Sequence, residues 1–263
     1  MQEPSKEMVD VRGYKLRVSR SGNGRPLLLL GDFVGPQGWQ PFMDTLALTH
    51  DVILPEHPGF GGLALPGWLD NISDLANFYL DLLDTLGLDH VKLLGLGCGG
   101  WIAADLATRN AARIDSLILC APAGLHIKGV PQIDTFLLSE EEGVLSLFHD
   151  RARGEPFLAG VMAPELEDAR LQNYEVNARL TWNPRSHDPD LRKWLHRIST
   201  PTLVIWGAQD RVFPQAYGEE WCSLVPGSRL EILENCGHAL HLEAPAAFIR
   251  LVDTFRSVER VAP

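Results

Sequence analysis

Short apolar runs alternate with longer segments of helical periodicity along most of this chain. Leu27–Leu30 is continuously apolar, which is typical of a strand buried on both faces of a sheet. Asn71–Leu86 carries apolar residues at helical spacing and is followed by Gly87, where a helix stop is expected. Strands that alternate with helices in this way predict an α/β fold, with a parallel sheet covered by helices on both faces.

The same criteria predict the remaining elements. The expected strands are Met8–Val11 and Tyr14–Ser19, which form a hairpin around Arg12-Gly13, and then Asp51–Leu54, Val91–Leu94, Ser116–Cys120, Leu203–Trp206 and Leu230–Leu233. The other expected helices are Trp39–Leu48, Gly99–Thr108, a segment near Gln215–Leu224, and a segment from Pro245 to about Val258.

The alternation stops between Ala121 and about Ile198, where several helices separated by Pro and Gly are expected. We predict a core formed by residues 1–121 and 199–263, interrupted by a helical cap of residues 122–198. Ligands of open α/β sheets bind at the carboxyl ends of the strands, so a cap over those ends would shape the pocket. Apolar cap residues suited to such a pocket are Phe136, Leu137, Phe148, Leu180 and Trp182.

Composition narrows the classes of partner. The 263 residues carry a formal charge of −11, which disfavours nucleic acid. There is no basic amphipathic run and no apolar stretch near the ~20 residues that span a bilayer, so no membrane partner is expected. The four cysteines form no CxxC pair and the nine histidines lack metal-site spacing, so we expect neither a metal nor another cofactor. The first ten residues are polar and acidic and resemble neither a signal nor a transit peptide. The cysteine composition fits a reduced cytoplasmic protein, and we expect its partner to be a small-molecule substrate or ligand.

The segment Val91–Trp101, VKLLGLGCGGW, has the strand, glycine-rich turn and helix of a nucleophile elbow. Other blocks accompany it in a fixed order: Gly31-Asp32-Phe33, PEHPGFGG at Pro55–Gly62, WGAQDRVFP at Trp206–Pro214 and NCGHALHLEAP at Asn235–Pro245. Over nearly its whole length the chain resembles α/β-hydrolases of the cap-bearing esterase or C–C hydrolase type. The resemblance implies the α/β-hydrolase fold, with a helical cap inserted after the sixth strand.

The resemblance also assigns roles. Asp210 stands where the family has its acid and His238 where it has its base. A carboxylate in this place fixes the tautomer of the imidazole and stabilises the imidazolium that forms in the reaction. The oxyanion hole would consist of the backbone N–H groups of Phe33 and Cys98. The nucleophile position, which should carry Ser, is Gly97, so the acyl-enzyme route is closed there and turnover by that route falls by about 10⁶-fold.

Other residues depart from the family pattern or allow different interpretations. A carboxylate at Asp32 would oppose negative charge in the adjacent oxyanion hole, so it could turn outward, be protonated, or serve as an acid or base. Cys98 could be a displaced nucleophile whose pKa is lowered at a helix N-terminus. We expect Glu243 to cap the last helix, His241 to be a packing or turn residue, and Arg179 to be an exposed cap residue.

These features leave three hypotheses. The first is a hydrolase or lyase that uses the His238/Asp210 pair as general base, without serine, on an ester, a lactone or a C–C bond of a small apolar carbonyl compound. The second is a catalytically silent protein that binds a ligand on a hydrolase scaffold. The third is a thiol hydrolase that uses Cys98. No pattern in the sequence indicates an oligomeric state.

Overall fold

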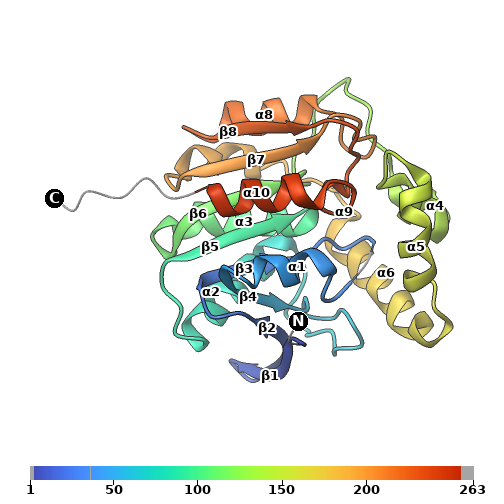
Figure 1. Cartoon of the computed structure of the whole chain (residues 1–263). Helices are drawn as coiled ribbons and strands as arrows, with labels where there is room; N and C mark the ends of the chain where they lie inside the picture. The colour runs from blue at the N-terminus through green and yellow to red at the C-terminus, as the bar shows by residue number, and fades with distance from the viewer. Residues whose placement is uncertain (1–2, 36, 256–263) are drawn as a thin grey trace.

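A mostly parallel sheet of eight strands forms the centre of the computed structural model, which describes residues 3–35 and 37–255 (Figure 1). The strand order is β1-β2-β4-β3-β5-β6-β7-β8. The strands are β1 Ser5–Val11, β2 Tyr14–Ser21, β3 Arg25–Leu30, β4 His50–Pro55, β5 Val91–Leu96, β6 Ile114–Cys120, β7 Thr202–Gly207 and β8 Arg229–Leu233.

The first two strands form the expected hairpin at one edge of the sheet. β1 pairs antiparallel with β2, and β2 pairs antiparallel with β4. Every neighbouring pair from β4 through β3 to β8 is parallel. All of the parallel strands therefore direct their carboxyl ends to the same edge, where the loops that follow them meet.

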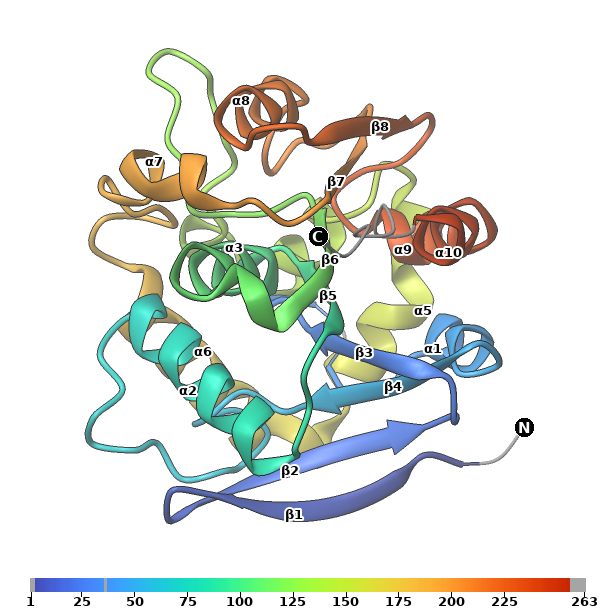
Figure 2. The same ribbon diagram turned by 90° about the vertical axis from the view of Figure 1, so that its left-hand side faces the viewer.

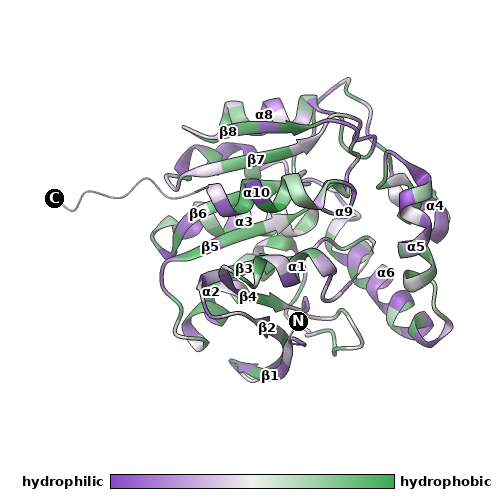
Figure 3. Ribbon diagram, viewed as in Figure 1, coloured by the Kyte–Doolittle hydropathy of each residue, from purple (hydrophilic) through white to green (hydrophobic). Residues whose placement is uncertain are grey.

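Helices cover both faces of the sheet, as the alternation predicts. Figure 2 shows α1 Pro41–Leu46 and α10 Pro245–Thr254 on one face, and α2 Ile72–Thr85, α3 Cys98–Arg109 and α8 Ala216–Leu224 on the other. The side chains of Leu27–Leu30 are fully buried between these layers. Figure 3 shows the same division, with hydrophobic residues along the central strands and hydrophilic ones on outward surfaces. The predicted α/β-hydrolase fold is confirmed.

The segment between β6 and β7, which we call the insert (residues 121–201), consists of helices and loops beside the ends of the strands (Figure 1). Its α-helices are α4 Glu140–Ser146, α5 Arg151–Val161, α6 Glu167–Thr181 and α7 Leu191–Trp194. Short 3-10 helices are η2 Thr135–Leu137, η3 Pro164–Leu166 and η4 Leu195–Arg197, and another, η1 Ala111–Arg113, precedes β6. Among the described residues, no helix is both long enough and apolar enough to span a bilayer.

One helix prediction is wrong in its bounds. The helix expected over Trp39–Leu48 is shorter, because Pro41 starts it and Leu48 lies in the exposed turn that leads into β4. α10 ends at Thr254, and the predicted end near Val258 lies outside the described residues. The short helix α9, Leu240–Glu243, was not predicted because a single turn has no apolar periodicity.

Candidate active site

Loops at the carboxyl ends of separate strands bring the predicted site residues together. Asp32 follows β3, Gly97 follows β5, Asp210 follows β7 and His238 follows β8. A cavity of about 30 Å³ is lined by Asp32, Gly97, Cys98 and His238. Residues more than 200 positions apart in sequence thus share one site because the parallel sheet directs these loops to one edge.

Asp210 and His238 form a buried hydrogen-bonded pair. The Nδ1–H of His238 donates to Asp210 Oδ2 at 2.8 Å. The other carboxylate oxygen of Asp210 accepts from the backbone N–H groups of Val212 and Phe213 at 2.8 and 3.0 Å. These bonds fix the imidazole so that Nε2 is the nitrogen that faces the rest of the site.

The carboxylate of Asp32 points into the site rather than outward. Its Oδ1 accepts two hydrogen bonds of 2.8 Å, one from the backbone N–H of Phe33 and one from that of Cys98. Its Oδ2 lies 3.5 Å from His238 Nε2. The outward orientation considered from the sequence is therefore wrong, because two N–H donors and an imidazole offer the carboxylate partners inside.

His238 lies between two carboxylates, and this determines its charge. Burial lowers the pKa of His238, but the charge and hydrogen bond of Asp210, followed by those of Asp32, outweigh burial and raise it to about 10. Burial likewise raises the pKa of Asp32, whereas His238 and the two N–H groups together bring it below its usual value. At neutral pH the site thus holds an imidazolium between carboxylates, and His238 has no lone pair with which to act as a base.

Gly97 occupies the turn between β5 and α3 with φ 52° and ψ −116°. L-residues rarely adopt this positive φ, and such backbone strain is typical of functional turns. A Cβ at this position would lie 2.2 Å from Cγ of Asp32 and within 2.4 Å of both its carboxylate oxygens. The Asp32 carboxylate therefore fills the space into which any side chain at residue 97 would project.

Cys98 does not have the environment of a reactive thiol. Burial, and then the charge of Asp32, raise the pKa of this thiol well above its usual value. The expectation of a lowered pKa is wrong because burial, and then the neighbouring carboxylate of Asp32, disfavour the thiolate. The third hypothesis, a thiol hydrolase, thus lacks an activated nucleophile.

His57 and Tyr79 support the loop that carries Asp32, and the sequence analysis did not single them out. His57 Nε2 lies 2.9 Å from the Gly31 carbonyl oxygen, and its Nδ1 lies 2.6 Å from the Tyr79 hydroxyl. Because a carbonyl can only accept, Nε2 carries the proton and Tyr79 donates to Nδ1. Burial lowers the pKa of His57 to about 4, so the ring is neutral and suited to this arrangement. In the sequence, the PEHPGFGG block that contains His57 was the feature that could have indicated this role.

Glu243 does not cap α10, so that expectation is wrong. Its carboxylate accepts from the backbone N–H groups of His149, Asp150 and Gly237 at 3.1, 3.0 and 2.6 Å. It thereby joins the loop between α4 and α5 to the loop of His238. His241 packs against Phe42 and Phe248, in agreement with a packing role, and burial lowers its pKa to about 4.

A cavity of about 530 Å³ separates the insert from the core beside this site. Of the cap residues expected to line a pocket, Phe136 does so, but Leu137 and Trp182 are largely exposed and Phe148 is buried against Phe157. Leu180 is buried and also does not line this cavity. Apolar residues of the insert can pack against neighbouring helices or line the cavity, and the sequence alone does not show which of the two they do.

Two further observations concern charged groups. Arg179 pairs with Asp70 at 2.7 Å near the surface, as expected of an exposed cap arginine. Within the described ranges, no three His, Cys, Asp or Glu side chains are grouped so as to hold a metal ion.

Comparison with known proteins defines the class. Residues 27–251 match the alpha/beta hydrolase family. A 2-hydroxy-6-oxononadienedioate/2-hydroxy-6-oxononatrienedioate hydrolase of Pseudomonas putida is 30% identical over 255 residues, covering 87% of this chain and 86% of the relative. The chain belongs to the alpha/beta hydrolase family.

Other relatives have similar names. A 2-hydroxymuconate semialdehyde hydrolase of Pseudomonas putida is 26% identical, with 92% of this chain and 91% of the relative covered. Among solved structures, the 2-hydroxy-6-oxo-6-phenylhexa-2,4-dienoate hydrolase of Rhodococcus sp. strain RHA1 matches with a TM-score of 0.77 and 20% identity over 95% of this chain and 97% of that one. This structural similarity concerns the fold.

Proposed function

We propose that this chain is a hydrolase that acts on a small, largely apolar compound without a serine nucleophile. The observation that carries the proposal is the buried His238–Asp210 hydrogen bond of 2.8 Å, with Nε2 directed into a site bordered by a cavity. A pair held in this way transfers protons to and from a reacting group. In this proposal Gly97 is the vacant nucleophile position, and residues 122–198 form a cap over the site.

Asp32 is the third member of the proposed machinery. The N–H groups of Phe33 and Cys98, which would serve as the oxyanion hole, both donate to its Oδ1. The sequence and the names of the relatives suggest as substrates an ester, a lactone or a compound with a C–C bond beside a carbonyl. Such a substrate fits this proposal if the Asp32 carboxylate moves away from those two N–H donors. Departure or neutralisation of Asp32 also lowers the pKa of His238, which then becomes a base.

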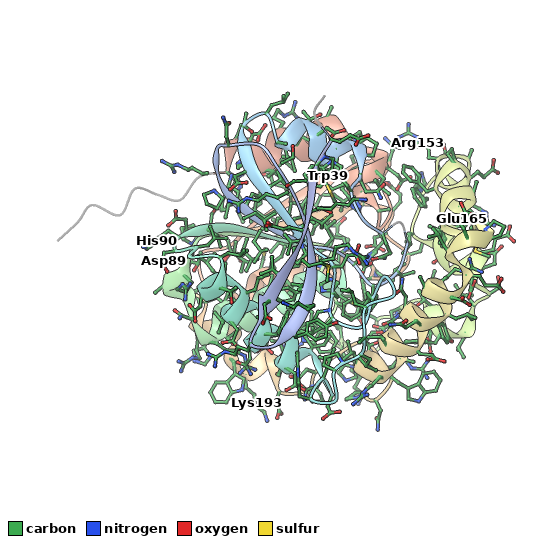
Figure 4. The ribbon with its side chains drawn as sticks, turned by 90° about the horizontal axis from the view of Figure 1, so that it is seen from below. Trp39, Asp89, His90, Arg153, Glu165 and Lys193 are labelled. Carbon is green, nitrogen blue, oxygen red and sulfur yellow. The ribbon has the colours of Figure 1, made fainter. Side chains whose placement is uncertain are left out.

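The proposal is tested with chromogenic esters, lactones and a 2-hydroxy-6-oxo-dienoate, using the unaltered chain, His238→Gln and His90→Gln. His90 is a matched control, because its side chain is exposed and lies on the side of the molecule remote from the insert (Figure 4). We expect His238→Gln to lower turnover by about 10²–10⁴-fold and His90→Gln to leave it unchanged. Equal turnover by the unaltered chain and His238→Gln contradicts the proposal.

The second candidate is a ligand-binding protein without catalytic activity. The observation that favours it is that a carboxylate of the protein itself already occupies both N–H donors. Saturable binding of panel compounds by calorimetry, with no product in any reaction, supports this candidate over the hydrolase. Any product whose formation depends on His238 excludes it.

A further inference from the structure

Two loops of the insert lie side by side, the one that follows β6 and the one between α6 and α7. Gly124 of the first loop and His187 of the second form an isolated parallel β-bridge. The N–H of Gly124 donates to the Ser186 carbonyl oxygen at 3.0 Å, and the N–H of Asp188 donates to the Gly124 carbonyl oxygen, also at 3.0 Å. These backbone bonds fix the register of two segments that are far apart in sequence.

This register brings together two histidines that have no role in the site of His238. The ring centroids of His126 and His187 lie 5.1 Å apart, with their planes tilted by 32°. Zn–N bonds of about 2.0–2.1 Å in a tetrahedral arrangement place the centroids of two ligating imidazoles roughly 5 Å apart. The separation of the two rings therefore suits a metal ion held between them.

A backbone carbonyl determines which nitrogen of His187 is available. The Nδ1 atom of His187 lies 3.0 Å from the Arg185 carbonyl oxygen. Because a carbonyl can only accept, Nδ1 carries the proton of the neutral ring and Nε2 keeps a lone pair. Histidines that bind metals almost always donate their other ring N–H in this way. His126 is exposed, so its ring is free to turn towards Nε2 of His187.

The charges around this histidine pair do not exclude a cation. The nearby guanidinium of Arg185 forms an ion pair with Asp134. Asp188 follows His187 directly, and its Oδ1 accepts only a backbone N–H, that of Asp190, among the bonds within the described residues. The whole chain carries a formal charge of −11, which further favours the approach of a cation.

We propose that His126 and His187 bind one divalent transition-metal ion, such as Zn²⁺, with water completing its coordination. Neutral imidazole is the commonest ligand for such ions in proteins. The described residues group no third His, Cys, Asp or Glu with this pair, so the site binds more weakly than a closed structural zinc site. Sequence spacing could not indicate it, because the two ligands come from separate loops.

A bound ion would join the two loops beside the candidate active site. Ala123 of the first loop and Ser186 of the second both line the cavity of about 30 Å³ at Asp32. The ion would add two bonds between side chains to the backbone bonds that already hold these loops. It would thereby stabilise one wall of the cavity without contacting the residues at its centre. This inference does not depend on the proposed hydrolase function.

Calorimetric titration with ZnCl₂ alone, at neutral pH, tests the site. We expect the unaltered chain to bind one Zn²⁺, and His126→Gln and His187→Gln each to lower the affinity at least about 10-fold, since even the loss of a ligand's hydrogen-bond partner has that effect. His196→Gln is the matched control, because His196 is also an exposed histidine of the insert, and it should bind as the unaltered chain does. Equal affinity in the unaltered chain and all three variants overturns the inference.

Hydrogen exchange locates the bound ion independently. Zn²⁺ should slow exchange of the backbone N–H groups of Gly124 and Asp188 in the unaltered chain and in His196→Gln, but not in His187→Gln. Exchange at these two groups that does not respond to Zn²⁺ overturns the inference, even where calorimetry detects binding. Neither result bears on the proposed hydrolase function, because His238 and its partners are unaltered in every variant.

Discussion

Gly97 and Asp32 depend on each other sterically. The glycine leaves space in the turn after β5, and the carboxylate of a residue from the loop after β3 fills it. The same carboxylate accepts hydrogen bonds from the N–H groups of Phe33 and Cys98 and helps to raise the pKa of His238. The absence of a side chain at Gly97 and the presence of a carboxylate at Asp32 thus together affect the protonation state of His238.

We predict that Gly97→Ser destabilises the protein by about 1–3 kcal/mol, because its Cβ would overlap the Asp32 carboxylate. Gly97→Ser should cost much less in the Asp32→Gly background than in the unaltered chain, since the overlapping group is then absent. Urea denaturation of the single and double variants measures the coupling.

Gly13→Ser is the control for this cycle. Gly13 also has a positive φ, of 87°, but a Cβ there meets nothing within 4 Å. Its loss of stability should therefore reflect backbone strain alone and should not change with Asp32→Gly. Additive effects of Gly97→Ser and Asp32→Gly would show that the overlap is relieved by other movements.

The orientation of Asp32 could not be predicted from the sequence. The motif places a carboxylate beside the expected oxyanion hole, but its direction depends on the empty space at Gly97 and on the imidazole of His238. These groups come from loops far apart in sequence and meet only in the folded chain. The pair of Asp210 and His238 was easier to predict because each lies in a recognisable block after a strand.

At the scale of elements, the central strands β3 to β7 were predicted well because they are buried on both faces and contain short apolar runs. The helices of the insert were less clear. α5 contains Pro156 in its interior, together with Gly154 and Gly160, and much of its surface is exposed. Such a helix depends on contacts with its neighbours, so its sequence alone shows no regular apolar stripe.

Glu243 links the insert to the loop of His238, and we predict that Glu243→Ala costs about 2–4 kcal/mol of stability. The substitution leaves three backbone N–H groups without their acceptor. Urea denaturation checks the loss, and hydrogen exchange at Gly237 and Asp150 should become faster. Glu219→Ala, at an exposed position of α8, is the matched control and should have little effect. A similar loss in both variants contradicts the role given to Glu243.

At the scale of the whole molecule, buried histidines with opposite pKa shifts should give a stability that is highest near pH 6.5. His57 and His241 have pKa values of about 4, so the unfolded chain binds protons before the folded chain does and stability falls from about pH 6.5 to 4. Each contributes at most about 3 kcal/mol to this loss. His238, with a pKa of about 10, stabilises the fold below pH 6.5, and this contribution is lost as the pH rises to 10.

Urea denaturation at pH 4.5, 6.5 and 9 checks this profile. His241→Gln should make the decline between pH 6.5 and 4.5 shallower, whereas His90→Gln should not. An unchanged decline in His241→Gln would mean that other groups govern stability in acid.

Among the residues that the structure describes, the strands do not close into a barrel, and the outermost strands β1 and β8 each have one edge without a neighbouring strand. β1 exposes Lys6, Glu7 and Asp10, and β8 carries the ion pair of Arg229 and Glu231. A strand from another chain that added to either edge would have to bury these charges. We therefore expect the charge pattern to disfavour edge-to-edge strand pairing between crowded copies of the chain.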